Sequence, residues 1–136
     1  MELPRVLVLD DEVGICTILS KILRDQQYDV YPIQSVAGAS EALAEFSFDA
    51  YLLDYRLHDG TGLQVAEKVR QKRSSAPIIL ISGYGAIEIG AEARTLEIFD
   101  VLEKPFNCER ICSTISQALS TSLLPVPRKL ISPISL

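Results

Sequence analysis

Three aspartates in this sequence stand at the ends of continuous apolar runs. Asp10 and Asp11 follow the run at 5–9, and Asp54 closes the run at 50–54. Such a run, bounded by turn residues, indicates a strand buried on both faces of a parallel sheet. Ligands bind at the carboxyl ends of the strands in open parallel sheets, and burial there disfavours a charged acid. We therefore expect a metal ion to compensate the charge, and Asp54 to be the reactive group.

The identity of the expected cation follows from the charges that it must balance. In the flavodoxin-like strand order 2-1-3-4-5, the first and third strands are neighbours, which would bring Asp10, Asp11 and Asp54 together. Two unit charges about 4 Å apart repel by roughly 4 kcal/mol at an effective dielectric constant of about 20. Hard carboxylate oxygens without histidine or cysteine suit Mg²⁺. The sequence therefore predicts Mg²⁺ as the cofactor of this site.

Two further strand candidates end in polar residues that suit phosphate chemistry. The run at 78–81 ends at Ser82, and the short run at 101–102 is followed by Lys104. Each residue alone would be an ordinary loop serine or surface lysine. Their joint position at the ends of strands favours one shared site, because the carboxyl ends of parallel strands meet at one edge of a sheet.

The elements that must position these residues alternate along the chain. Strands are expected at 5–9, 29–33, 50–54, 78–81 and 101–102. Helices are expected from the apolar periodicity that includes Ile15, Ile18 and Leu19 up to about residue 26, at 36–46, at 63–72, at 86–95, and from a cap at Asn107 to about residue 120. Five strands alternating with five helices predict an α/β fold with a doubly wound parallel sheet covered on both faces.

Composition bounds the class of protein. A length of 136 residues with 48% apolar residues suits one domain, and a net charge of -5 argues against direct binding of nucleic acid. Acids interrupt the first apolar run, so no signal peptide is expected, and prolines and polar residues make 111–127 a poor membrane span. Cys16, Cys108 and Cys112 lack zinc-type spacing, and we expect ordinary buried or half-buried thiols in a reducing cytoplasm.

The domain is expected to cover residues 1–120 and to leave a tail at 121–136. The tail contains Pro125, Pro127 and Pro133, and this density of proline excludes a continued helix. The tail is either a linker, as chain termini often are, or an extended arm that packs on its own or another subunit.

The quoted residues carry a resemblance to a known family. Asp10-Asp11-Glu12, Asp54, Ser82 and Lys104-Pro105-Phe106 resemble, in order and spacing over residues 4–120, the receiver domain of two-component response regulators. The resemblance implies a flavodoxin-like fold with five strands in the order 2-1-3-4-5. It also implies a phospho-accepting aspartate and Mg²⁺-dependent transfer of a phosphoryl group from a sensor histidine kinase or phosphotransfer protein.

Metal binding can be assigned position by position from the resemblance. Asp11 would bind Mg²⁺ directly, and Asp10 would do so directly or through water. Asp54 and the backbone carbonyl of Arg56 would complete the protein ligands.

The resemblance assigns the phosphoryl chemistry in the same way. Asp54 would be the nucleophile, Lys104 would pair with a phosphoryl oxygen, and Ser82 would donate its hydroxyl to another one. The Lys104–Pro105 peptide bond would be cis. The protein would then be a signalling phospho-acceptor that assists its own phosphorylation and dephosphorylation, and not an enzyme acting on other substrates.

The chain departs from the family pattern at three places. Val101 stands where an aromatic residue is usual, Glu97-Ile98 replaces Gly-Ala, and His58 replaces a proline. His58 is expected to be a solvated loop residue. Two of these changes fall within residues 86–120, the face expected for output and for a homodimer. We therefore expect phosphorylation to occur but its signal to be passed to a downstream output domain or protein in an unusual way.

Two other functions remain open at this point. The chain could be a phosphorylation-independent interaction module with a receiver fold, which keeps the acids without using them. It could also be an aspartate-based phosphatase, but such enzymes need a second aspartate two residues after the nucleophile, where this sequence has Arg56. The intact set of acids, hydroxyl and lysine favours the phospho-accepting receiver.

Overall fold

A five-stranded parallel sheet forms the centre of the computed structural model, which describes residues 2–83 and 89–122. Its strands lie in the order β2-β1-β3-β6-β7 and all pair in parallel. This is the predicted flavodoxin-like order 2-1-3-4-5. The strands are β1 (Arg5–Leu9), β2 (Asp29–Ile33), β3 (Ala50–Asp54), β6 (Ile78–Ser82) and β7 (Asp100–Glu103).

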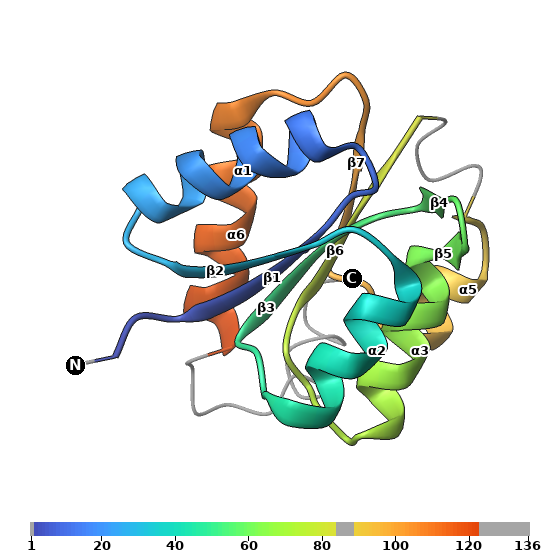
Figure 1. Ribbon diagram of the computed structural model, residues 1–136. Helices are drawn as coiled ribbons and strands as arrows, with labels where there is room; N and C mark the ends of the chain where they lie inside the picture. The colour runs from blue at the N-terminus through green and yellow to red at the C-terminus, as the bar shows by residue number, and fades with distance from the viewer. Residues whose placement is uncertain (1, 84–88, 123–136) are drawn as a thin grey trace.

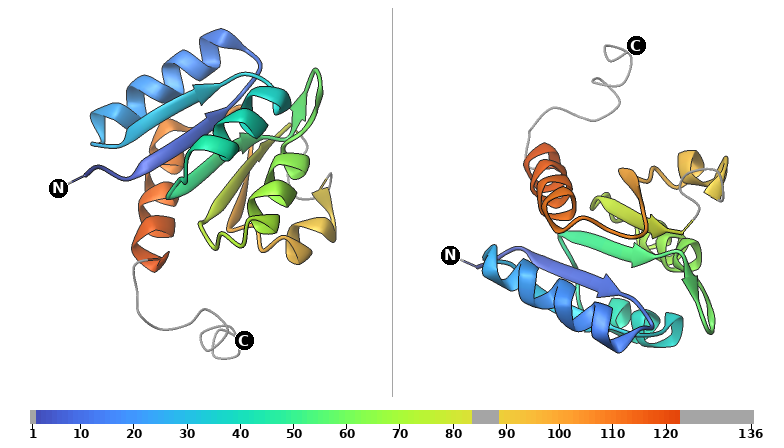
Figure 2. Two further views of the ribbon diagram at one scale, coloured as in Figure 1. Left: turned by 60° about the horizontal axis from the view of Figure 1, so that its bottom comes forward. Right: turned by 90° about the horizontal axis from the view of Figure 1, so that it is seen from above.

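Helices cover both faces of the sheet, as predicted (Figure 1). On one face lie α1 (Val13–Asp25) and α6 (Cys108–Ser122). The opposite face carries α2 (Val36–Glu45), α3 (Gly62–Gln71) and α5 (Glu92–Thr95), and Figure 2 shows the same helices from two further directions. No helix of the described ranges is long and apolar enough to cross a membrane.

The buried strands explain the apolar runs of the sequence. Every residue of β3 and β6 is buried, and successive side chains of a strand point to opposite faces. One core cluster therefore lies beneath α1 and α6, and it includes Val6, Val8, Leu52, Ile79 and Ile81. The other lies beneath the remaining helices, and it includes Leu7, Leu9, Tyr51, Leu53, Ile78 and Leu80.

Polar side chains define the starts of three helices. The hydroxyl of Ser35 accepts a hydrogen bond from the Gly38 N–H at the start of α2. Thr61 and Gln64 form a reciprocal capping box at the start of α3. The Asn107 Oδ1 accepts from the N–H of Arg110, 3.1 Å away, so Asn107 caps α6 as predicted. Such caps satisfy backbone donors that the first turn of a helix leaves without partners.

The buried face of α1 agrees with the predicted one at Ile15, Leu19 and Leu23 but not at Ile18. Ile18 was expected on the apolar face, but this side chain is 52% exposed, and Cys16 and Ser20 are buried with Leu19 and Leu23. The contact stripe runs through positions i, i+3, i+4 and i+7 from Cys16. A sequence rich in isoleucine offers two overlapping stripes, and the packing of the sheet selects one of them. Cys108 is also exposed, contrary to expectation.

Three other predictions can be compared with the structure in part. A two-stranded antiparallel hairpin, β4 (Arg56–Leu57) and β5 (Gly60–Thr61), occupies the expected glycine loop. Of the helix expected at 86–95, the described portion contains the four-residue α5, and residues 84–88 lie outside the described residues. The last helix continues to Ser122, and the rest of the expected tail, 123–136, also lies outside them.

A single arginine ties α3 to the segment that leads into β7. The guanidinium of Arg70 donates hydrogen bonds to the carbonyl oxygens of Leu96 at 2.8 Å and Glu97 at 3.1 Å, and also to those of Ser74 and Ala76. Glu97 has a φ of 53°, a left-handed conformation that favours glycine. Glu97, which stands where the family pattern has glycine, therefore adopts a conformation that suits glycine better than glutamate.

Candidate functional site

The candidate site lies at the carboxyl ends of the central strands. Asp10 follows β1, Asp54 ends β3 and Ser82 ends β6, and these three strands are direct neighbours in the sheet. Lys104 follows β7 on the far side of β6. The predicted strand order thus brings four separated parts of the chain to one edge, which is the usual place for ligands in such sheets.

The three predicted acids form one cluster. One carboxylate oxygen of each of Asp10, Asp11 and Asp54 lies within 4.8 Å of the others, and these are the residues that the described part of the chain offers as a metal-binding group. Asp10 is 1% exposed. Its Oδ1 accepts a hydrogen bond from the Glu12 N–H at 2.9 Å, whereas its Oδ2 receives none from any residue that the structure describes.

Lys104 brings a positive charge to two of these acids. Its Nζ lies 3.0 Å from Asp54 Oδ2 and 3.8 Å from Asp10 Oδ2. The Lys104–Pro105 peptide bond is cis, as predicted. The backbone N–H of Lys104 donates to the carbonyl oxygen of Ser82 at 2.9 Å. The ends of β6 and β7 are therefore linked directly beside the acids.

Burial dominates the electrostatics of the cluster. It raises the pKa of Asp54 to about 6, although the hydrogen bond from Lys104 acts in the opposite direction. Burial also raises the pKa of Asp10, against the hydrogen bond from Glu12. For Lys104, burial lowers the pKa, but the hydrogen bond and charge of Asp54 outweigh it and the pKa is raised. One ammonium therefore compensates the three acids incompletely, which favours an additional cation.

The donor set of the cluster fits Mg²⁺. The three acids provide only oxygen ligands, and hard oxygen ligands are those that Mg²⁺ prefers. The buried Asp10 Oδ2 accepts no hydrogen bond from the described residues. A bound cation would interact with its free lone pairs.

The two remaining predicted residues lie next to the cluster. Ser82 is buried, and its backbone pairs with Glu103 in the sheet. Arg56 comes two residues after Asp54, begins the β4–β5 hairpin and has an exposed side chain whose guanidinium lies over the Tyr55 ring. Gly62 follows the hairpin and lets the chain pass close to the end of β3, because a Cβ at this position would collide with the backbone carbonyl oxygen of Asp54.

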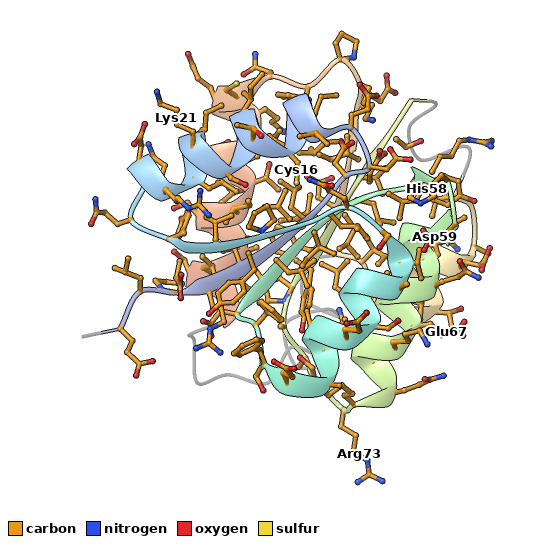
Figure 3. All side chains as sticks on the ribbon, in the orientation of Figure 1. Cys16, Lys21, His58, Asp59, Glu67 and Arg73 are labelled. Carbon is orange, nitrogen blue, oxygen red and sulfur yellow. The ribbon has the colours of Figure 1, made fainter. Side chains whose placement is uncertain are left out.

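Two neighbouring residues of the hairpin have contacts that the sequence interpretation missed. The side chain of His58 is exposed, as expected for a solvated loop residue, but its backbone N–H donates to Asp11 Oδ2 at 2.9 Å. The oxygens of Asp59 accept from the N–H groups of Val36 and Ala37 at the start of α2. Figure 3 shows His58 and Asp59 together at this end of the molecule. The sequence did offer a signal for the contact with Asp11: His58 stands where the family usually has proline, and proline has no N–H to donate.

Comparison with known proteins gives the same family over most of the chain. The family model described as response regulator receiver domain matches residues 6–116. The chain is 32% identical over 119 residues to the response regulator protein PilR of Pseudomonas aeruginosa, covering 88% of this chain and 27% of PilR. It is 30% identical over 115 residues to the transcriptional regulatory protein ZraR of Escherichia coli, covering 85% of this chain and 26% of ZraR. The chain thus spans about a quarter of the length of these relatives.

Solved structures agree with this assignment. A CheY-like receiver domain protein from Methanospirillum hungatei superimposes with a TM-score of 0.82 at 24% identity, covering 88% of this chain and 96% of that one. The beryllofluoride-activated NtrC4 receiver domain dimer gives a TM-score of 0.76 at 30% identity, covering 86% and 97%. The chain therefore belongs to the response regulator receiver domain family.

Proposed function

We propose that this domain accepts a phosphoryl group on Asp54 from a sensor histidine kinase or phosphotransfer protein and thereby changes its affinity for a downstream partner. The observation that carries the proposal is the position of Asp54. Its carboxylate lies in a cluster with Asp10 and Asp11, and one of its oxygens is 3.0 Å from the ammonium of Lys104. A carboxylate held between a candidate metal site and a fixed cation suits attack on an anionic phosphoryl group.

The residues proposed to hold Mg²⁺ are Asp10, Asp11, Asp54 and the backbone carbonyl of Arg56. When bound, the ion would offset the charge of the phosphoryl oxygens and keep Asp54 ionised. The raised pKa of Asp54, about 6, supports the need for such an ion, because a protonated carboxyl is a poor nucleophile.

The proposed transfer is a single in-line displacement. An oxygen of Asp54 forms a bond to phosphorus while the bond from phosphorus to a histidine nitrogen of the donor breaks, and the electron pair of that bond stays on the imidazole. Lys104, already paired with Asp54, neutralises charge on the transferred group. Ser82, buried at the end of the neighbouring strand, donates its hydroxyl to a phosphoryl oxygen.

The added charge is proposed to act on the ends of β6 and β7. A phosphoryl group brings about -1.5 to -2 charges, and the backbone hydrogen bond from Lys104 to Ser82 joins the two strands at that point. Val101 on β7 is half-buried and offers no aromatic ring to move. We therefore expect the signal to pass through the strand ends to the face formed by residues 86–120, of which 86–88 lie outside the described residues.

The output of the domain is proposed from its relatives. PilR and ZraR are a response regulator protein and a transcriptional regulatory protein, and each extends well beyond the matched region. We propose a cytoplasmic receiver that controls a downstream output domain or protein, pairs with a second copy through residues 86–120, and does not itself contact nucleic acid. It signals, and it catalyses no reaction beyond its own phosphorylation and dephosphorylation.

Intact-mass measurement after incubation with acetyl phosphate and Mg²⁺ tests the proposal. The wild-type chain is expected to gain one phosphoryl group, and the Asp54→Asn variant is expected to gain none. Asp25→Asn, which changes an exposed aspartate at the end of α1, serves as the matched control and should retain the gain. The absence of any gain would favour a phosphorylation-independent interaction module, and steady release of phosphate would favour a phosphatase.

A second measurement tests the route of the signal. Backbone amide NMR shifts are compared with and without beryllofluoride, which mimics the bound phosphoryl group. Shifts are expected at Ser82, Glu103 and Lys104, which join the two strand ends, and further along β7 and α6. Shifts that stop at the site residues and do not reach the rest of β7 or α6 would contradict this route.

A further inference from the structure

His58 lies at the edge of the acid cluster and makes two contacts with one of its members. Its backbone N–H donates to Asp11 Oδ2 at 2.9 Å, and its imidazole Nδ1 lies 3.7 Å from the same oxygen. The residue stands in the turn between β4 and β5, next to Asp59 (Figure 3). It is the single histidine of the sequence.

We propose that the imidazole of His58 is an additional ligand of the divalent cation held by Asp10, Asp11 and Asp54. The site would then take first-row transition-metal ions such as Zn²⁺ as well as Mg²⁺. This inference rests on the metal site of the proposed function and adds a nitrogen ligand to its oxygen set.

The first argument is distance. Two neighbouring ligand atoms that each lie about 2.1 Å from one metal ion are separated by about 3.0 Å in octahedral geometry and about 3.4 Å in tetrahedral geometry. The imidazole Nδ1 and Asp11 Oδ2 are 3.7 Å apart, so a shift of less than about 1 Å brings them to either separation. The side chain of His58 is 67% exposed, and an exposed side chain changes rotamer easily. The N–H bond to Asp11 meanwhile keeps the backbone of His58 beside the cluster.

A second, independent observation concerns Asp10. This residue is buried, and its Oδ2 accepts no hydrogen bond from the described residues. The Nζ of Lys104 lies 3.8 Å from this oxygen, which is longer than a hydrogen bond. A buried acceptor without a partner calls for a ligand, and a cation bound between Asp10 and Asp11 would supply one. His58 contacts Asp11 but lies outside the group of three acids whose oxygens are within 4.8 Å of one another, so its imidazole would have to turn toward the ion to bind it.

The chemistry of the enlarged ligand set determines which ions it favours. Mg²⁺ prefers oxygen ligands and gains little from an imidazole, whereas Zn²⁺, Ni²⁺ and Co²⁺ bind imidazole nitrogen well. Loss of the His58 side chain should therefore weaken binding of a transition-metal ion and leave Mg²⁺ binding almost unchanged. A role limited to shaping the loop would affect both ions equally.

Calorimetric titration of the full chain with Zn²⁺ and with Mg²⁺ tests the proposal. Cys108 and Cys112 are exposed and half-buried on α6 and could bind Zn²⁺ themselves, so all variants carry Cys108→Ser and Cys112→Ser. In this background, His58→Ala should reduce the affinity for Zn²⁺ about 10-fold or more and the affinity for Mg²⁺ less than about 2-fold. His58→Ala retains the backbone N–H that holds Asp11.

NMR of the imidazole provides a readout that does not depend on phosphorylation. Because the chain has one histidine, its ring nitrogen signals report on His58 alone, and one nitrogen should shift on addition of Zn²⁺. Unchanged imidazole signals together with equal Zn²⁺ affinity of the His58→Ala variant would overturn the proposal. The Asp11→Ala variant separates this outcome from failure of the proposed function, because it should lower the affinity for both Zn²⁺ and Mg²⁺. Retention of full Mg²⁺ affinity in that variant would contradict the metal site itself.

Discussion

The ammonium of Lys104 is shared by two buried carboxylates, since its Nζ lies 3.0 Å from Asp54 Oδ2 and 3.8 Å from Asp10 Oδ2. The three groups come from the ends of three different strands. Without the lysine, Asp10 and Asp54, which are 1% and 5% exposed, would lose the positive charge that lies between them, and buried charges without partners are costly.

Replacement of Lys104 by methionine should therefore destabilise the protein when divalent cations are chelated. We expect a loss of about 2–3 kcal/mol in the free energy of unfolding at neutral pH, below the value for a fully buried pair because Lys104 is partly exposed. The affinity for Mg²⁺ should rise, because the ammonium no longer repels the ion. Urea denaturation in EDTA and Mg²⁺ titration measure both effects. Lys21→Met, on the exposed surface of α1 (Figure 3), is the control, and an equal loss in the two variants would contradict the expectation.

The raised pKa of Asp54 predicts a specific pH dependence of stability without divalent cations. Burial raises this pKa from 3.8 to about 6, so the folded state binds the proton more tightly than the unfolded state. The stabilising contribution is complete below about pH 4 and is lost as the pH rises through about 6, which amounts to roughly 3 kcal/mol. Unfolding in EDTA should show this loss in the wild type relative to Asp54→Asn, and saturating Mg²⁺ should abolish it. Parallel pH profiles of the two proteins in EDTA would argue against a buried, incompletely compensated carboxylate.

Gly62 should tolerate no side chain. Gly62→Ala places a Cβ against the backbone carbonyl oxygen of Asp54, and the strain should cost about 1–3 kcal/mol. Gly14→Ala is the matched control, because Gly14 lies in α1 and, apart from its chain neighbours and the backbone of that helix, no atom of the described residues lies within 4 Å of the Cβ position. Alanine in a helix should stabilise that variant by about 0.5–1 kcal/mol. Thermal denaturation of both should give opposite signs, and the same sign in both would be evidence against the steric argument.

The left-handed backbone conformation of Glu97 predicts that glycine at this position would stabilise the protein. Its φ of 53° is unfavourable for a residue with a side chain, and its side chain is exposed, whereas its carbonyl oxygen is what Arg70 contacts. Glu97→Gly should raise the free energy of unfolding by about 0.5–1 kcal/mol, because the contact is kept and the strain is removed. Glu92→Gly in α5 should instead destabilise the protein. Chemical denaturation distinguishes these results, and a loss of stability in Glu97→Gly would show that the side chain matters.

Much of the fold could be predicted because its cause lies in local patterns. The apolar runs of β1, β3 and β6 are continuous since these strands are buried on both faces, and their order places Asp10, Asp54 and Ser82 at one edge. The roles of these residues in phosphoryl transfer stay predictions. What the sequence could not provide depends on contacts between distant segments.

Two examples show this limit. Ile18 looked like a core residue on periodicity alone, but the register of α1 against the sheet buries Cys16 and Ser20 instead. The bond from the His58 N–H to Asp11 spans 47 positions in the sequence. It depends on the β4–β5 hairpin, whose two-residue strands are too short to give a periodic signal.

The β4–β5 hairpin has a consequence for how this domain tolerates changes in chain length. Exposed turns usually accept inserted residues. Within this turn, however, His58 holds Asp11, Asp59 binds the first N–H groups of α2, and Thr61 caps α3. One residue added between His58 and Asp59 would change the distance along the chain between the contact with Asp11 and the contacts with α2 and α3, so an insertion here should be far more harmful than its surface position suggests.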